Sequence, residues 1–409
     1  VIALVTTPLP TALPAPAAPA PEGLALALGE ATVEVASPVA PTPTTAATAE
    51  AVGATTAATL IPTPTLAPTA ILSPTAPPLP PYNRIAGLPI IPQKFNNCGP
   101  TNLTLVLNYY GVAVDQFDVA AVIRPTYEDR NVSPEEIVSY VREQTGLAAS
   151  AYVGGDIDLL RRLVDAGFPV IIEKGLEPDE TTGWMGHYLT VFGYDDITQH
   201  LYVRDTYLGP WKGDGLVAYQ DTERYWTQFN HVFIVVHPPE RTAELAALLG
   251  PGYEGAAMWS AAADRARATL AHEPGNAFAW FNLGTSLTMQ ARQQGSGEPI
   301  EGNGAALYEA AAAAFDQARL LGLPARMLWY QFAPYEAYLA AGRPADVLAL
   351  AEATFASQGG RSVEETYLYQ GHALRALGDE PAARAAYDRA AELNPTSPVG
   401  LAAVAALGG

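Results

Sequence analysis

The sequence predicts an α+β domain followed by an all-α region, with a disordered segment in front of both. Of the 36 prolines in the 409 residues, 17 fall within residues 1–81. Short apolar runs typical of strands then accompany helical patterns up to about residue 239, and Ala-rich helical periodicity continues to the end. We therefore assign residues 1–82 to a disordered Pro/Ala/Thr-rich tether, 83–239 to the α+β domain and 250–409 to a helical domain.

The tether lacks the side chains that a folded core requires. Its large apolar residues are sparse and non-periodic, so it cannot bury enough surface to offset the entropy of ordering. Runs such as Pro41-Thr42-Pro43-Thr44 favour an extended, polyproline-like chain. We interpret the apolar residues Val1–Val5 as the tail of a removed signal or anchor, and we expect an extracellular or cell-surface location.

Charge and cysteine content exclude several classes of protein. The formal net charge is −20, which disfavours binding to nucleic acid or to anionic membranes. The single cysteine, Cys98, excludes an intrachain disulfide framework and a Cys-rich metal site. Since the sequence also contains no phosphate-binding loop, nucleotide motif or metal-ligand cluster, we expect no cofactor. We expect no membrane insertion either, apart from a lost N-terminal anchor.

Helices occupy the first part of the α+β domain. Cys98 is followed by Gly99-Pro100 and by apolar residues at helical spacing, so it begins a helix that ends near Gly111. The sequence Ser133-Pro134-Glu135-Glu136 is a capping box with proline at the first helical position. The sequence thus predicts further helices over Gln116–Ile123, from Ser133 to Gly146 and over Asp156–Ala166.

Strands follow in the second part of this domain. Apolar or alternating runs predict strands over residues 169–173, 187–194, 201–205 and 231–236. The second and third runs are separated by a turn near Asp196–Gln199 and therefore form a hairpin. A hairpin places the start of its first strand beside the end of its second, so we expect His187 and Asp205 to be neighbours.

The lone cysteine stands where a thiol is activated. A helix N-terminus stabilises negative charge, so the pKa of Cys98 should fall, and a nearby imidazolium would lower it further. Among six histidines, His187 begins a strand behind Gly186, which leaves access to its ring. A nucleophile and base of this kind need a third group to orient the imidazole, and we assign that role to Asp205.

Some roles near the site have rival candidates. Asp195 or Asp196 could orient the imidazole, but both lie at the far end of the strand from His187, so we rank them below Asp205. The Gln93 amide and the Cys98 backbone N–H are candidates to stabilise an oxyanion. Asn96 and Asn97 could also line that site, although asparagines in this position more often shape a turn.

Three segments follow one another along the chain. They are Gln93-Lys94-Phe95-Asn96-Asn97-Cys98-Gly99-Pro100, Gly186-His187-Tyr188-Leu189-Thr190-Val191-Phe192-Gly193-Tyr194-Asp195 and Leu201-Tyr202-Val203-Arg204-Asp205. In this order they resemble the C39-like cysteine peptidases of the papain-like superfamily. It covers roughly residues 85–238 and implies a papain-like fold. By this resemblance Cys98 is the nucleophile, His187 the general base and acid, Asp205 the orienting group and Gln93 the oxyanion donor.

The chain departs from the family pattern at two places. The family often has Asp-Pro where this chain has Asp205-Thr206, and an additional loop follows at residues 209–214. Both departures bear on substrate specificity more than on the triad.

The helical domain resembles tetratricopeptide repeats. Small residues recur at helical spacing next to aromatic ones, as paired helices in a solenoid require. We expect a half unit from about Gly255 and then about three repeats, with a polar insertion at Gln293–Gly304. The pattern is carried by Trp280, Leu283 and Gly284, by Ala311, Phe315 and Ala318, and by Ala383, Tyr387 and Ala390. Such solenoids bind peptides or partner proteins.

Together these features predict a cysteine peptidase-like hydrolase that cleaves a peptide or protein substrate, with a repeat domain that recruits a substrate or a protein partner. One alternative is a scaffold that binds peptides or proteins without turnover. Another is a papain-like amidase or acyltransferase that acts on a non-protein substrate, because this fold supports several acyl transfers.

Overall fold

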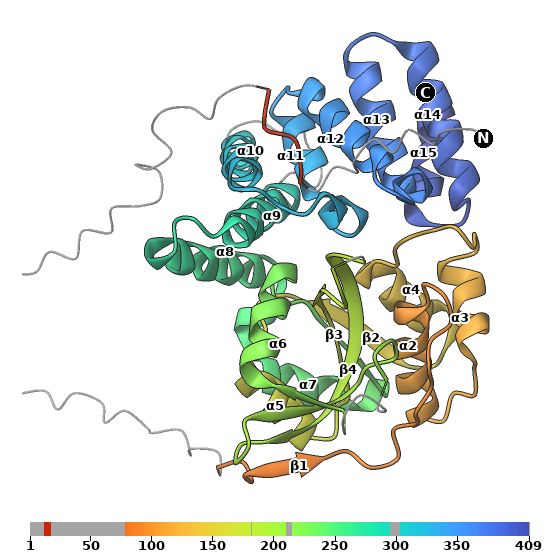
Figure 1. Cartoon of the computed structure of the whole chain (residues 1–409). Coiled ribbons are helices and arrows are strands. Elements are labelled where there is room, and N and C mark those ends of the chain that lie inside the picture. The colour runs from red at the N-terminus through yellow and green to blue at the C-terminus, as the bar shows by residue number, and fades with distance from the viewer. Residues whose placement is uncertain (1–11, 18–77, 181, 210–214, 295–302, 409) are drawn as a thin grey trace, which may run out of the picture. The chain divides into compact units, whose positions relative to one another are not determined.

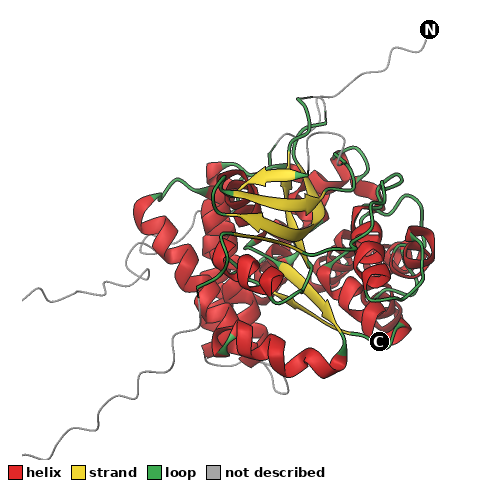
Figure 2. Ribbon diagram, turned by 90° about the horizontal axis from the view of Figure 1, so that it is seen from below, coloured by secondary structure: helices red, strands yellow, loops and turns green. Residues whose placement is uncertain are grey.

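An antiparallel sheet with helices on both faces forms the first folded part of the chain (Figures 1 and 2). The computed structural model describes residues 12–17, 78–180, 182–209, 215–294 and 303–408. The signal-like residues Val1–Val5, most of the expected tether and most of the expected insertion at Gln293–Gly304 lie outside the described residues.

The sheet has the strand order β2-β7-β3-β4-β5-β6, and β1 pairs with β4. All these pairings are antiparallel, as the helices-then-strands pattern predicts. The hairpin of β4 and β5 is confirmed, and its register shifts between Val191 and Gly193. The strands are β1 Tyr82–Arg84, β2 Ala148–Tyr152, β3 Val170–Leu176, β4 Met185–Asp195, β5 His200–Arg204, β6 Leu216–Ala218 and β7 Phe233–His237.

The sheet is buried on both faces because its central strands are apolar at consecutive positions. Val170 and Ile172 of β3 point to one apolar core, and Ile171 between them points to the other. In β7, Phe233 joins the first core and Ile234 the second. This alternation follows from the two-residue period of a strand. Two layers of helices are therefore needed, one over each face.

Helices α2, α3 and α4 supply the core on one face, and α5 supplies much of the core on the other. Their starts follow the sequence closely. Ser133 and Asp115 each form a capping box with the residue three positions later, and the Asp156 side chain accepts from the Leu159 amide. These helices are α2 Cys98–Tyr109, α3 Gln116–Ile123, α4 Pro134–Gln144, α5 Ile157–Asp165, α6 Tyr219–Trp226 and α7 Thr242–Leu249.

The remaining chain is helical to its described end. Gly284 of α9 packs against the ring of Phe315 in α10, and Gly371 of α13 packs in the same way against Tyr387 in α14. A Cβ atom at either glycine would lie within 2.7 Å of the ring. These repeated contacts fit the expected repeats, whose assignment to the tetratricopeptide class stays a prediction. The helices are α8 Gly255–His272, α9 Ala277–Gln294, α10 Asn303–Leu321, α11 Ala333–Ala340, α12 Pro344–Ala356, α13 Glu364–Ala376, α14 Glu380–Leu393 and α15 Pro398–Gly408.

The structure adds elements that the sequence did not predict. Strand β2 pairs with β7 along its whole length, and the short strand β1 pairs with the end of β4. Strand β1 begins at Tyr82, a residue that the sequence assigned to the tether. Residues 12–17 also differ from the expected tether, because they lie against the helical region. Tertiary pairing supplies the hydrogen bonds in each case, and local composition does not encode it.

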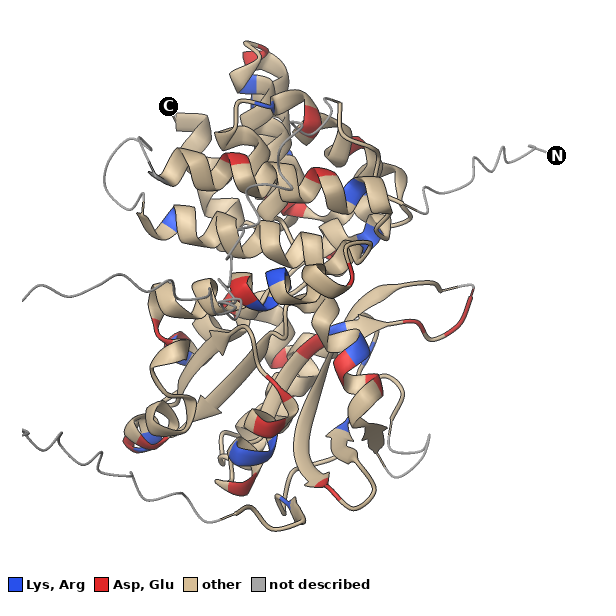
Figure 3. Cartoon of the chain, turned by 90° about the vertical axis from the view of Figure 1, so that its left-hand side faces the viewer, with Lys and Arg blue, Asp and Glu red and all other residues tan. Residues whose placement is uncertain are grey.

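No helix in the described residues is long and apolar enough to cross a bilayer. Charged residues of both signs are distributed over the helices and around the sheet alike (Figure 3). Only 4 of the 42 acidic residues precede residue 83, so the excess negative charge belongs to the folded part.

Four carboxyl groups are buried where α4 and the loop before it meet α13. Asp129, Glu136, Glu364 and Glu365 are each less than 9 % exposed. The Asn131 amide donates to Glu365 Oε1 at 3.1 Å and to the backbone oxygen of Trp329 at 2.7 Å. Burial raises the pKa of all four carboxyls, and that of Glu136 to about 8. The mutual proximity of these groups raises the pKa of Glu365 further.

Replacing Glu365 by glutamine should reduce the loss of stability with rising pH. Above pH 4.5 an unfolded glutamate releases its proton, whereas the folded Glu365 retains it. The folded state then loses at most roughly 1.4 kcal/mol per pH unit for one such group, until pH passes its raised pKa. Glutamine keeps the Oε1 atom that accepts from Asn131 and has no titratable proton at this position. Urea unfolding at pH 5 and pH 7 should show a smaller decrease for Glu365→Gln than for wild type.

The exposed Glu352 in α12 provides the matched control. Glu352→Gln should follow the wild-type pH dependence. An equal slope for Glu365→Gln and wild type would show that Glu365 ionises in the folded state as it does in the unfolded chain.

Candidate active site

Cys98 is the first residue of α2, and the turn before it is held by buried contacts. Asn96 adopts a left-handed conformation with φ of 56°. The Asn97 side chain is buried, donates to Gln116 Oε1 at 3.2 Å and accepts from the Arg124 guanidinium at 2.7 Å. Both asparagines therefore shape the turn. Cys98 is partly exposed, so a reagent or a substrate can reach the thiol.

His187 and Asp205 come from neighbouring strands of the hairpin. His187 lies near the start of β4, and Asp205 follows the last residue of β5. Their side chains are in contact, with His187 Nε2 3.0 Å from Asp205 Oδ1. The same carboxylate oxygen accepts from the backbone amides of Tyr207 at 3.0 Å and Leu208 at 2.7 Å. These two backbone hydrogen bonds therefore fix the position of the carboxylate that contacts the imidazole.

The Nδ1 atom of His187 is the ring nitrogen that remains for the thiol. Nδ1 is buried and accepts or donates no hydrogen bond within the described residues. The imidazole ring nevertheless interacts electrostatically with Cys98. Burial opposes charge on each member of the triad, and the partners outweigh it. Burial lowers the pKa of His187, but Asp205 raises it to about 9. Burial raises the pKa of Asp205, but the His187 cation holds it at about 2.

The thiol follows the same logic. Burial raises the pKa of Cys98, while the adjacent His187 lowers it more, helped by the backbone of Tyr188 and Gly99. Its pKa is therefore below the ordinary thiol value. Because the imidazolium keeps its proton to about pH 9, a cation lies beside the thiol and stabilises its thiolate form.

Gln93 is held with its amide oxygen occupied. The Thr206 hydroxyl donates to Gln93 Oε1 at 2.8 Å. The Gln93 backbone amide donates to the backbone carbonyl oxygen of Thr206 at 3.0 Å. The Asn102 amide in turn donates to the Thr206 hydroxyl at 3.2 Å and to the carbonyl of Cys98 at 2.9 Å. Gln93 Nε2 is left to donate, as an oxyanion site requires. Thr206, where the sequence departs from the C39-like pattern, thus links Gln93 to the nucleophile's helix.

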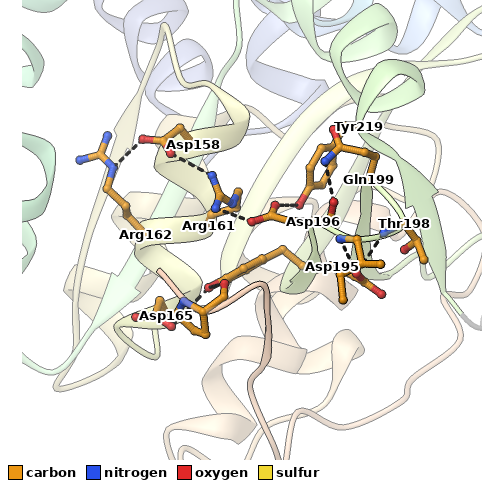
Figure 4. A network of polar contacts seen from close by, with 12 residues as sticks. Asp158, Arg161, Arg162, Asp165, Asp195, Asp196, Thr198, Gln199 and Tyr219 are labelled. Carbon is orange, nitrogen blue, oxygen red and sulfur yellow. Dashed lines mark hydrogen bonds and ion pairs between the residues drawn. The ribbon is translucent and has the colours of Figure 1, made fainter. Parts of the chain in front are cut away.

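The rival acids Asp195 and Asp196 are engaged at the other end of β4 (Figure 4). Asp195 Oδ1 accepts from the backbone amides of Ile197 and Thr198 and closes the hairpin turn. Asp196 pairs with Arg161 of α5 and accepts from the Tyr219 hydroxyl at 2.8 Å. Asp205 is the acid that contacts His187.

Cys98 opens into a pocket of about 560 Å³. Gln93 lines the pocket as well, whereas His187 and Asp205 are buried behind its wall. One side of the pocket comes from the helical region, which the sequence did not indicate. Those residues are Arg326, Trp329, Tyr330 and Gln358.

The helical residues are fixed in place by contacts to the sheet domain. The Arg326 guanidinium donates to the carbonyl of Thr182 at 2.6 Å. A Cβ atom at Gly186 would lie 2.9 Å from the ring of Tyr330, so only glycine fits there. The expectation that Gly186 leaves access to the imidazole is therefore corrected, because this space holds Tyr330.

Glu173 is a further pocket residue that sequence reasoning missed. It lies in β3, is 4 % exposed and lines the pocket near Cys98. Burial raises its pKa well above the usual range, although an interaction with the Tyr188 side chain opposes the shift. The pocket thus contains a carboxyl group that keeps its proton where ordinary glutamates are charged. No local pattern marks Glu173 as a pocket residue, because it ends the short apolar run of residues 169–173.

Comparisons with known proteins agree with the family resemblance. Residues 79–234 match the sequence model of the Peptidase C39 like family, so the chain contains a C39-like peptidase domain. One similar solved structure is a C39-like peptidase from Bacillus anthracis, 20 % identical, with 38 % of this chain and 96 % of that chain covered and a TM-score of 0.29. No curated protein matches.

A second similar structure is a double glycine motif protease from an AMS/PCAT transporter, solved in complex with the leader peptide. It is 22 % identical, with 38 % of this chain and 94 % of that chain covered and a TM-score of 0.28.

Removing the Thr206 hydroxyl should impair turnover without changing the thiol. In Thr206→Val the Gln93 amide loses the donor that orients it, so we expect kcat for p-nitrophenyl acetate hydrolysis to fall about tenfold, less than loss of an oxyanion donor itself. KM and the alkylation rate of Cys98 should change little, and Thr206→Ser should restore kcat. Equal loss in Thr206→Val and Thr206→Ser would contradict this role.

The alkylation rate of Cys98 should depend on His187. In His187→Ala burial still raises the pKa of the thiol, but the partner that lowers it is gone. We expect iodoacetamide to react at pH 7 at least tenfold more slowly than with wild type, and the pH midpoint to rise. The chain has no other cysteine, so the rate reports Cys98 alone.

His231→Ala is the control for this experiment, because His231 is buried and pairs with Glu223 away from the thiol. It should react at the wild-type rate. If both variants slow alkylation equally, a general change in structure and not the loss of His187 would be the cause.

Proposed function

We propose that the domain is a cysteine peptidase that hydrolyses peptide bonds through Cys98, His187 and Asp205. The observation that carries this proposal is the partly exposed Cys98 at a helix N-terminus, with a lowered pKa beside a histidine whose other nitrogen lies 3.0 Å from a buried carboxylate. A nucleophile, a base and an orienting acid in this relation are the parts that acyl transfer requires.

In the acylation step, the Cys98 thiolate forms a bond to the substrate carbonyl carbon. The oxyanion of the tetrahedral intermediate accepts from Gln93 Nε2 and from the Cys98 N–H, which has no acceptor within the helix because it lies in the first turn. The carbon–nitrogen bond then breaks as the His187 imidazolium gives its proton to the leaving amine.

In the deacylation step, neutral His187 takes a proton from water, whose oxygen attacks the thioester carbonyl. The carbon–sulfur bond breaks, the acid product leaves, and the thiolate–imidazolium pair is regenerated. Asp205 remains ionised throughout and stabilises each imidazolium, consistent with a pKa of about 2.

The helical region would take part in substrate binding. Trp329 and Tyr330 offer aromatic rings to the pocket that Gln93 also lines, and the protonated Glu173 offers a donor within it. These features suit an extended peptide whose side chains are apolar near the scissile bond. The repeats would then hold the substrate or its carrier protein next to the thiol.

Cleavage of a peptide library tests the activity. Wild type and Cys98→Ala are incubated with a digest of a bacterial proteome, and new termini are mapped by mass spectrometry. We expect termini that appear only with wild type, and His187→Ala should lower their rate of formation by about 10²- to 10⁴-fold. Asp205→Asn should also lose activity, because the amide no longer stabilises an imidazolium.

The same experiment separates this function from the alternatives. Equal peptide retention by wild type and Cys98→Ala, with no Cys98-dependent termini, would favour a binding scaffold. If Cys98-dependent release of ammonia or of an acyl group occurs without new peptide termini, the amidase or acyltransferase alternative holds instead.

A further inference from the structure

Residues 12–17 of the N-terminal segment lie against the helical region, close to α11 in Figure 1. This stretch has the sequence Ala12-Leu13-Pro14-Ala15-Pro16-Ala17. Leu13 is only 5 % exposed, although it belongs to a segment that cannot form a core of its own. Its burial therefore depends on the surface that it contacts.

The segment begins as a short antiparallel pairing with the loop after α10. Ala12 forms a bridge with Pro324, and the amide of Leu13 donates to the carbonyl of Leu323 at 3.0 Å. Both groups of this bond are main-chain atoms. An extended peptide that adds to an exposed backbone edge forms main-chain bonds of the same kind.

Arg319 then contacts two successive carbonyl groups of the segment. Its Nε donates to the oxygen of Pro14 at 2.7 Å and its Nη2 to the oxygen of Ala15 at 2.9 Å. Beyond them, the amide of Ala17 donates to Asp346 Oδ1 at 3.0 Å. A planar guanidinium presents its donors in a fixed fork, so it matches two carbonyls only when the chain is extended between them.

These two charged groups belong to a buried network inside the helical region. Arg319 Nη1 pairs with Asp346 at 2.8 Å, and both residues are less than 5 % exposed. Arg343 links Asp346 to the fully buried Asp316. A buried guanidinium needs acceptors for its donors, and Asp346 occupies only part of that capacity. The carbonyls of Pro14 and Ala15 supply the remainder that Nε and Nη2 require.

The two prolines lie at positions where the segment donates no backbone hydrogen bond to the groove. The amides used are those of Leu13 and Ala17, while Pro14 and Pro16, between them, have no N–H to satisfy. Proline also fixes φ near its polyproline value, so the segment loses less entropy on docking. The pattern recognised is therefore a buried leucine followed by proline, one residue with an exposed side chain, and proline.

We propose that this groove, formed by Arg319, Leu323, Pro324 and Asp346, is a binding site for extended Leu-Pro-x-Pro peptides, and that the chain's own residues 12–17 occupy it. None of the four groove residues lines the pocket at Cys98, so the site is separate from the candidate active site. The sequence Ile61-Pro62-Thr63-Pro64, which lies outside the described residues, has the same pattern with isoleucine in place of leucine.

A peptide added in trans tests the groove on the full-length chain. The probe is a fluorescent peptide with the sequence of residues 9–20, and Leu13→Asp in the protein vacates the groove by placing a charge where leucine is buried. We expect the Leu13→Asp chain to bind the probe at least tenfold more tightly than wild type, whose segment competes at high effective concentration. Fluorescence anisotropy measures both affinities.

Two controls tie that binding to the contacts described. A probe that carries Leu13→Asp should not bind the vacated chain. Adding Arg319→Lys to that chain should weaken the normal probe at least tenfold, because an ammonium cannot hold two carbonyls as the fork does. Since Arg319 is buried, thermal unfolding of this variant is measured as well. Failure of the normal probe to bind the vacated chain, or its equal binding to wild type, overturns the proposal.

A disulfide identifies the chain that supplies the segment. The bond from Leu13 to Leu323 makes Ala12 and Pro324 a non-hydrogen-bonded pair, whose Cα atoms are close enough for a disulfide. In a Cys98→Ser background, Ala12→Cys with Pro324→Cys should form an intrachain bond and run as a monomer on a non-reducing gel. Adding Leu13→Asp should reduce the yield. A covalent dimer would overturn the assignment of the segment to its own chain.

Discussion

The ion pair between His187 and Asp205 is the interaction on which the candidate site depends. Both side chains are buried, and an isolated charge on either would be strongly disfavoured. Each charge stabilises the other, and the Asp205 carboxylate raises the pKa of His187 to about 9. A cation next to Cys98 then allows the thiolate to form at lower pH. The hairpin of β4 and β5 supplies the pair, and the sheet supplies the burial.

The other half of the site comes from α2, which must be held at a fixed distance from that hairpin. Asn102 performs this task from within the helix, since its amide donates to the Tyr188 carbonyl in β4 and its oxygen accepts from the Thr190 hydroxyl. The same amide reaches Thr206, and through it Gln93. One buried side chain thus connects the helix of Cys98, the strand of His187 and, through Thr206, Gln93.

The helical region contributes to the same pocket, and it also holds part of the N-terminal segment. Tyr330 occupies the space that Gly186 leaves over β4, and the buried carboxyls beside Asn131 bring α13 against the loop before α4. Elsewhere in the helical region, the Arg319 guanidinium donates hydrogen bonds to the backbone oxygens of Pro14 and Ala15. Different residues of the helical region therefore line the pocket at Cys98 and contact residues 14 and 15.

Much of the sheet domain could be predicted from local sequence, because caps, proline positions and two-residue alternation act over a few residues. These signals located the start of α2 at Cys98, the capping box at Ser133 and the hairpin that joins His187 to Asp205. By contrast, the contact of Tyr330 with Gly186 and the hydrogen bonds of Arg319 to residues 14 and 15 join parts of the chain over a hundred positions apart. Such contacts depend on how whole layers pack and carry no local pattern, so only the tertiary structure decided them.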